Sequence, residues 1–162
     1  MGASQSPEPA SRSLAASAPA LASFGAAHST LTLATTTSSG LPQAASLFFA
    51  VAADGSLIFV SGAESRHSLN IAANGQAAVT IHTETWKWHD IAGVQMEGSV
   101  RAVPAGPERE AAWDTYRAKF PFVTAFESEV SQSTFYRFTP RWVRLIDNRV
   151  RFGFREEFTV GE

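Results

Sequence analysis

Alternating apolar and polar residues in the first half of the chain predict a series of short β-strands. Leu31, Leu33 and Thr35 are separated by single polar or small residues, which is the two-residue period of a half-buried strand. Asp54-Gly55 is a strong hairpin signal between two further apolar runs. The predicted strands cover residues 29–37, 43–53 and 57–61. We expect them to pair consecutively and antiparallel.

The second half of the chain alternates between predicted strands and helices. Ser65 as an N-cap and Asn74-Gly75 as a left-handed stop predict a helix over residues 65–73. Residues 108–120, which lie between two prolines, carry an apolar stripe with helical spacing and predict a second helix. The remaining predictions are strands over 76–83 and 91–103, an irregular connection over 122–133, and a final hairpin of 134–146 and 149–160 that turns at Asp147-Asn148.

The N-terminal segment is rich in alanine, serine and proline and offers little to pack. Residues 1–17 are therefore expected to form a flexible tail. A short helix is predicted from about Pro19 to Ala27, because proline is tolerated near the start of a helix.

Together these elements predict a mainly β fold. Six or seven short antiparallel strands, with helices inserted between the third and fourth strands and before the last pair, are typical of an antiparallel β-barrel with short α-helical insertions. Residues 18–162 are expected to form a single domain.

The charge, the cysteine content and the length of the apolar runs argue against several classes of protein. The chain of 162 residues has a net charge of −2 and 17% charged residues, so a nucleic-acid partner is not expected. It contains no cysteine, which excludes disulfides and thiolate chemistry. No apolar run approaches the roughly 20 residues of a membrane span, and no signal-peptide pattern is present, so a cytoplasmic protein without membrane contact is expected.

The segment from Ser61 to Ser68 has the strongest chemical signal. It runs from a predicted strand end into a predicted helix N-terminus, where backbone N–H groups, hydroxyls and Arg66 can bind a phosphate group. Taken alone, these residues favour a plain helix cap at Ser65 with Arg66 on the surface. His67 is able to bind the same phosphate, act as an acid, or lie half-exposed on the helix.

Other signals are weaker. The four histidines have no metal-ligand spacing, so no metal site is predicted, and no Rossmann, P-loop or nucleophile-elbow pattern occurs. Trp86 and Trp88 lie two apart in a polar loop and could form a wall for a planar ligand or a dimer contact.

Four short motifs, in this order and spacing, resemble the pyridoxamine 5′-phosphate oxidase-like FMN-binding split-barrel superfamily and a small bacterial branch within it. They are Leu33-Ala34-Thr35, residues 41–47 (LPQAASL), Ser65-Arg66-His67 and residues 93–98 (GVQMEG). The resemblance covers roughly residues 18–158. It implies a homodimer with FMN in clefts between the subunits.

The resemblance also implies the binding residues. The phosphate would be held by the segment after the third strand, backbone groups of residues 45–47 would follow the flavin edge, and Gln95 would reach the flavin. Trp142 or Arg144 would close the site from the other subunit. The implied cofactor-binding residues are Ala45, Ser46, Leu47, Ser61, Ser65, Arg66, His67, Gln95 and Trp142.

The function so implied is an FMN-dependent oxidoreductase in which flavin N5 exchanges a hydride, with an unknown substrate. The chain lacks the C-terminal arginine-rich motif of true pyridoxamine 5′-phosphate oxidases, so vitamin B6 activity is not expected. No catalytic residue is assigned; His67, His89 and Tyr116 are the nearest candidates for an acid or base. The alternatives are a non-catalytic protein that binds or senses flavin or another phosphate-bearing ligand, and a dimeric scaffold with an empty cleft.

Overall fold

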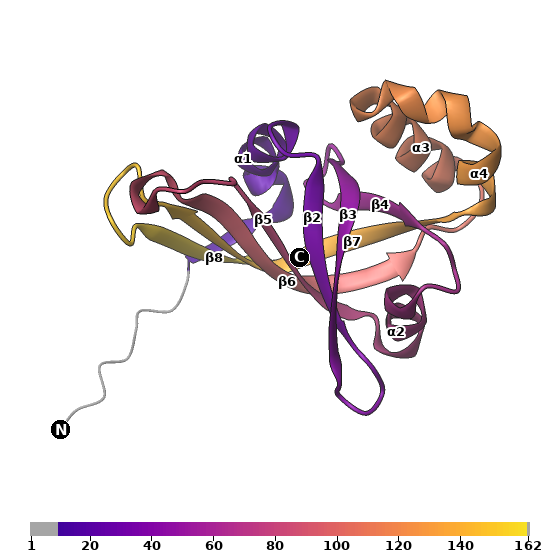
Figure 1. Cartoon of the computed structure of the whole chain (residues 1–162), viewed down its shortest axis with the longest axis horizontal. Helices are drawn as coiled ribbons and strands as arrows, with labels where there is room; N and C mark the ends of the chain where they lie inside the picture. The colour runs from indigo at the N-terminus through magenta and orange to yellow at the C-terminus, as the bar shows by residue number, and fades with distance from the viewer. Residues whose placement is uncertain (1–9, 162) are drawn as a thin grey trace.

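The structure is a computed structural model that describes residues 10–161 (Figure 1). Its elements in chain order are β1 (Ala10–Ser13), α1 (Leu14–Ala26), β2 (Thr30–Thr36), β3 (Pro42–Val51), β4 (Leu57–Ser61), α2 (Arg66–Asn74), β5 (Gln76–His82), the 3-10 helix η1 (Trp88–Asp90), β6 (Ala92–Ala102), α3 (Pro107–Lys119), the 3-10 helix η2 (Pro121–Phe126), α4 (Glu127–Gln132), β7 (Thr134–Asp147) and β8 (Arg155–Gly161).

Six antiparallel strands close into a barrel. Their order is β7-β4-β3-β2-β5-β6, and β6 pairs back onto β7 to complete the ring. Strand β8 continues the sheet beyond β7, and β1 lies parallel to β8 at its edge. The predicted mainly β barrel with short helices is confirmed, including the consecutive antiparallel pairing of β2, β3 and β4.

The inward-facing apolar side chains of the alternating strands fill the barrel interior. Leu31 and Leu33 of β2 face inward, as do Val94 and Met96 of β6, and all four are buried. Full burial of an aliphatic side chain stabilises the fold by about 1.5–3 kcal/mol relative to exposure. The largest side chains at the centre of this core are Phe49, Phe59, Phe138 and Phe158.

A second apolar cluster lies outside the barrel, under α3 and η2. Ile58 of β4 and Phe135 of β7 pack there against Tyr116 and Phe120. Strand β4 is therefore buried on both faces, which explains its continuous apolar run of residues 57–60.

The N-terminal region differs from the prediction. Residues 10–17, expected to belong to a tail, form β1 and the first turn of α1, while residues 1–9 lie outside the described part of the chain. Helix α1 begins at Leu14, because the Ser13 hydroxyl caps it by accepting a hydrogen bond from the Ala16 N–H. Pro19 lies inside the helix, where it has no N–H to donate to the preceding turn.

Two connections also differ. Residues 121–132, predicted to be irregular, form η2 and α4. The last hairpin has no two-residue turn at Asp147-Asn148; the connection spans residues 148–154 instead. It folds back onto η1, because Asn148 Nδ2 donates to the Trp88 carbonyl at 2.7 Å. No described helix is long and apolar enough to cross a membrane.

Candidate functional site

The outer side of the barrel carries a flat floor of small side chains. Thr32 of β2 is opposite Thr80 of β5 in the register, and Ala34 is opposite Ala78. Leu33, Val79 and Ile81, which alternate with these residues and point inward, are buried. None of the four outward side chains is longer than a threonine. They form the base of an open groove of about 410 Å³.

One side of this groove is a fixed polar and aromatic wall. Arg144 Nη1 donates to Gln95 Oε1 at 3.2 Å, and its Nε donates to Glu157 Oε1 at 2.8 Å. The same guanidinium lies 4.9 Å from the centre of the Trp142 ring. Gln95 and Trp142, two of the predicted binding residues, are therefore brought together with Arg144 in one chain. The groove also includes Glu97.

A second hollow of about 290 Å³ adjoins the groove, and the two share Thr32 and Thr80. Ser46, opposite Thr32 in the register, lines it together with His82. His82 is exposed, and its side chain forms no hydrogen bond with any other described residue. Its imidazole is therefore available to a ligand.

The predicted backbone contacts at residues 45–47 lie on a half-open strand. Residues 42–48 of β3 pair with β2, whereas β4 pairs only with residues 49–51. Within residues 10–161, no strand covers the other edge of residues 42–48. Leu47 packs against the barrel core, so this residue and Ala45 can offer a ligand their backbone rather than their side chains.

The end of β4 and the start of α2 form a compact polar cluster. His67 Nε2 lies 2.7 Å from Ser61 Oγ and 3.0 Å from Ser65 Oγ. Ser65 is the N-cap, as predicted, and accepts a hydrogen bond from the Ser68 N–H at 3.3 Å. Gly75 ends the helix in the predicted left-handed conformation, with φ of 64°.

Arg66 and His67 differ in exposure. Arg66 is exposed, and its guanidinium forms no ion pair or hydrogen bond within the described residues. His67 is only 8% exposed, and burial lowers its pKa below 6.5, so the ring is neutral near pH 7. The cluster therefore offers a ligand two hydroxyls, an imidazole that can donate or accept a hydrogen bond, and a guanidinium without a partner. Together these groups suit a phosphate.

Helix α2 is anchored next to the groove floor. Asn70 Nδ2 donates to Thr35 Oγ1 at 3.0 Å and lies 3.5 Å from Gln43 Oε1. Thr35 directly follows Ala34 of the floor, and Asn70 is one helical turn after His67. The polar cluster and the floor are thus connected through one buried hydrogen bond.

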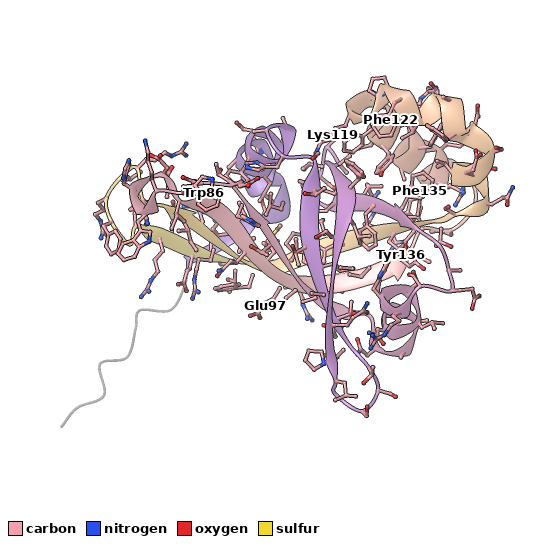
Figure 2. All side chains as sticks on the ribbon, in the orientation of Figure 1. Trp86, Glu97, Lys119, Phe122, Phe135 and Tyr136 are labelled. Atoms are coloured by element: carbon pink, nitrogen blue, oxygen red, sulfur yellow. The ribbon has the colours of Figure 1, made fainter. Side chains whose placement is uncertain are left out.

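Sequence reasoning missed Lys119, a half-buried cation. Its Nζ donates to the carbonyls of Gly25, His28 and Phe49 at 2.8, 2.7 and 2.7 Å. Figure 2 shows Lys119 where α3 meets the barrel. Burial lowers the pKa of Lys119 to about 8. No sequence pattern marks it, because its acceptors lie 70 to 94 residues away.

Two suggested acid–base candidates do not lie in the groove. Tyr116 is buried in the second apolar cluster, and burial raises its pKa to about 12. His89 is exposed in η1, where it pairs with Asp90 at 3.3 Å. Among residues 10–161 no group of three or more histidine or acidic side chains is placed to hold a metal ion.

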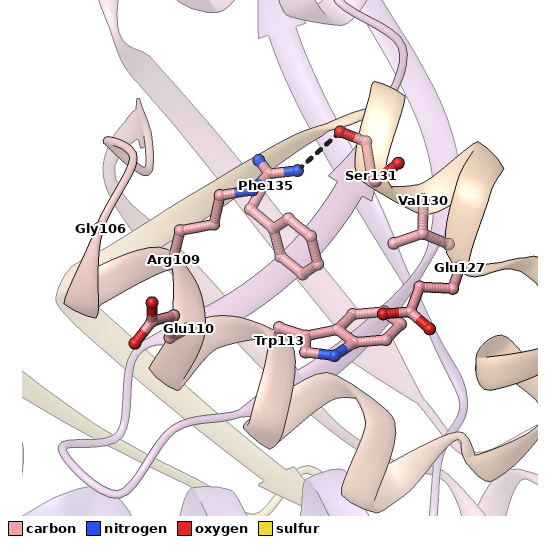
Figure 3. A pocket seen from close by; sticks show the side chains of 8 residues that line it. All are labelled: Gly106, Arg109, Glu110, Trp113, Glu127, Val130, Ser131 and Phe135. Atoms are coloured by element: carbon pink, nitrogen blue, oxygen red, sulfur yellow. Dashed lines mark hydrogen bonds between the residues drawn. The ribbon is translucent and has the colours of Figure 1, made fainter.

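A third hollow, between α3 and α4, is a packing feature of the helical layer. Trp113 lies edge-on to Phe135 with ring centres 6.2 Å apart, and Arg109 spans the cleft to the Ser131 carbonyl (Figure 3). This hollow of about 270 Å³ contains none of the predicted binding residues.

Comparison with known sequences identifies a family. The sequence profile described as pyridoxamine 5′-phosphate oxidase matches residues 17–147. No curated protein sequence matches the chain.

Several solved structures share the fold. A heme binding protein from Mycobacterium smegmatis has a TM-score of 0.72 and 20% identity, over 91% of this chain and 58% of that chain. A heme storage protein from Vibrio cholerae has a TM-score of 0.65 and 17% identity, over 75% and 88% of the two chains. An FAD-binding protein from Mesorhizobium loti has a TM-score of 0.62 and 17% identity, over 75% and 85%. The chain thus spans less than two thirds of the M. smegmatis protein.

Proposed function

The chain belongs to the pyridoxamine 5′-phosphate oxidase family, and we propose that it is an FMN-binding oxidoreductase whose flavin ring lies on the groove floor. A planar ring system needs a flat surface without protruding side chains. The floor of Thr32, Ala34, Ala78 and Thr80 meets this need. Gln95 at the wall would donate to or accept from the ring edge.

The phosphate of FMN would bind at the start of α2. Arg66 supplies an unpaired guanidinium there, and Ser61 and Ser65 supply hydroxyls. The observation that carries the FMN proposal is the connection of this cluster to the floor through Asn70 and Thr35. A ligand with both a flat ring and a phosphate uses both surfaces.

FMN, when bound, supplies hydride transfer through its N5 atom. The chain's own residues would bind, orient and partly cover the ring. We propose no proton-transfer residue. The substrate would enter at the open side of the groove.

The test is reconstitution followed by desalting. The purified protein is incubated with FMN or riboflavin, and the absorbance of retained flavin is recorded. We expect FMN to be retained more tightly than riboflavin, and NAD(P)H to bleach the bound flavin, with recovery in air. Retention without bleaching would indicate a flavin-binding protein without this activity, and absence of retention would contradict FMN binding.

Heme is a second candidate, favoured by one specific observation. His82 is exposed and free of hydrogen bonds, and it lies two residues beyond Thr80 in the adjoining hollow. A neutral imidazole is a common ligand of heme iron. A porphyrin on the same floor would place its iron near this side chain, and two structural relatives are named as heme-binding or heme-storage proteins.

The two candidates make opposite predictions for two variants. Arg66→Ala is expected to weaken FMN and leave hemin binding unchanged, whereas His82→Ala is expected to abolish the hemin-induced absorbance shift and leave FMN unchanged. The measurement is a titration of each variant with each ligand. A hemin shift that persists in His82→Ala would remove the case for heme at this position.

A further inference from the structure

The hollow that helix packing leaves between α3 and α4 has the shape and size of a small-molecule site. The rings of Trp113 and Phe135 form two nearly perpendicular walls, and Val130 of α4 contributes a third (Figure 3). Phe135 is buried, whereas Trp113 and Val130 are only half-buried, so part of their apolar surface faces the hollow. The volume of about 270 Å³ equals roughly nine water molecules, which is room for one aromatic ring with a short substituent.

The basic side chain that lines this hollow, Arg109, is already engaged by its own chain. Its Nη2 donates to the carbonyls of Ser131 and Ser133, both at 3.1 Å. The guanidinium carbon also lies 4.9 Å from the centre of the Phe135 ring, as in a cation–π contact. Arg109 therefore links α3 to the end of α4, and its charge is directed to carbonyls and to a ring of the protein itself.

The acidic side chains of the hollow have no counter-ion. Glu110 of α3 and Glu127 of α4 both line it, and within residues 10–161 neither carboxylate forms an ion pair or a side-chain hydrogen bond. In the view of Figure 3 they lie on either side of the Trp113 ring. Each is in the first turn of its helix, where backbone N–H groups favour a negative charge. The fold therefore favours both negative charges but supplies no cation for either.

We propose that this hollow binds a small organic cation, which is an ammonium group on a short apolar or aromatic body. The ammonium lies against the Trp113 ring and beside Glu110 and Glu127, because an indole face and a carboxylate both attract a positive charge. The body covers the open surface of Trp113 and Val130 and contacts Phe135 at the back. A neutral molecule of the same shape gains only the apolar contact, and the two carboxylates repel an anion.

This site is separate from the groove that is proposed to hold FMN. The two hollows have no lining residue in common, and the lining residues of the α3–α4 hollow come from the helical layer and the start of β7. The proposal therefore goes beyond the proposed function and does not depend on it.

Three probes of similar shape test the charge preference. Benzylamine is a cation at pH 7, benzyl alcohol is neutral and benzoate is an anion. Calorimetric titration of the purified protein is expected to give benzylamine a dissociation constant at least about tenfold lower than that of benzyl alcohol, because a charge-assisted hydrogen bond contributes this much, and benzoate should bind most weakly. Equal affinity for benzylamine and benzyl alcohol, benzoate binding as tight as that of benzylamine, or no benzylamine binding at about 10 mM would overturn the proposal.

Charge-removing variants locate the cation. The double variant Glu110→Gln and Glu127→Gln keeps the side-chain shapes, so benzyl alcohol binding should be unchanged while the preference for benzylamine falls below about threefold. The matched control is Glu129→Gln, which removes a carboxylate of α4 that does not line the hollow and should retain the full preference. A preference that persists in the double variant, or that disappears in the control, would contradict the position of the ammonium.

Trp113 supplies a second readout. Benzylamine is expected to change the tryptophan fluorescence, and Trp113→Phe should remove this change and weaken binding by about threefold or more, because an indole face attracts a cation more strongly than a phenyl face. The melting temperature without ligand shows whether each variant keeps its fold. An unchanged benzylamine affinity in folded Trp113→Phe would contradict the contact with the indole.

FMN distinguishes this proposal from the proposed function. Saturating FMN is expected to leave the benzylamine dissociation constant unchanged, and a change would contradict the separation of the two sites. Failure of the protein to bind FMN would contradict the proposed function alone, since the benzylamine titrations and their variants would still decide the cation site.

Discussion

Two basic side chains in this protein, Lys119 and Arg66, illustrate opposite uses of a positive charge. Lys119 has three N–H groups, and three backbone carbonyls of its own chain accept all of them. Arg66 has five N–H donors, and no described residue accepts any of them. The first charge is fully used by the fold, and the second is available to a ligand.

The surroundings of the two cations extend this contrast. Lys119 joins α3 to the end of α1 and to β3, and the Gly25 carbonyl at the end of α1 also accepts a hydrogen bond from the His28 N–H. Arg66 stands beside hydroxyls and a neutral imidazole that also favour an anion. A buried or shifted cation is therefore a poor marker of function by itself, and the number of unused donors separates the two cases.

Replacing Lys119, whose three N–H groups all donate to backbone carbonyls, should have the largest effect on stability. Lys119→Met keeps the length of the side chain but leaves three carbonyls without their donor, so the free energy of unfolding is expected to fall by about 2–3 kcal/mol. Urea unfolding followed by tryptophan fluorescence measures this change. Ligand affinity measured well below the unfolding midpoint should be unchanged; an affinity loss larger than the stability loss would break the comparison.

Replacing Arg66 should have the opposite result: ligand binding weakens and stability does not change. Arg66→Ala is expected to weaken FMN binding by about 1.5–3 kcal/mol, the range for hydrogen bonds to charged groups, and to leave urea unfolding unchanged. Riboflavin, which has no phosphate, should bind both proteins equally. Arg151→Ala, a second exposed arginine on the 148–154 connection, serves as the control. An unchanged FMN dissociation constant in Arg66→Ala would contradict the phosphate site.

A smaller effect is expected at the wall of the groove. Gln95→Ala removes one neutral hydrogen-bonding side chain and should weaken FMN binding by about 0.5–1.5 kcal/mol, with a shift of the flavin absorbance band. Calorimetric titration and the absorbance spectrum measure these changes. Loss of folding without a change in ligand binding would make Gln95 structural, through its bond to Arg144.

Local patterns made much of the fold predictable. The alternation of β2 and the Ser65 and Gly75 caps of α2 depend on neighbouring residues and were predicted correctly. The 148–154 connection was not, because its path depends on Asn148 contacting η1 about 60 residues earlier. The start of α1 differs from the prediction because the Ser13 cap fixes it at Leu14, although Pro19 then lies inside the helix.

The candidate site likewise contains residues that a local motif indicates and residues that only the tertiary structure brings together. Ser65 and Arg66 were identified from a local motif, whereas the floor depends on cross-strand register, which brings Ala34 opposite Ala78. Small outward residues carry no local signal, since alanine and threonine are ordinary on a strand surface. The Lys119 contacts likewise depend on tertiary packing alone.

The smallest expected effect is a change of stability with pH at His67. Burial lowers the pKa of this side chain below the ordinary 6.5, so the unfolded chain takes up a proton at a higher pH than the folded chain. The unfolded state then binds more protons, and stability present above pH 6.5 is lost as the pH falls through the folded pKa. Urea unfolding between pH 7.5 and 5 should show this loss, and His67→Gln should reduce it. Bound FMN should reverse the sign, because a phosphate beside the imidazole favours its charged form. An identical pH dependence in the wild-type protein and His67→Gln, with and without FMN, would assign His67 to the fold along with Lys119.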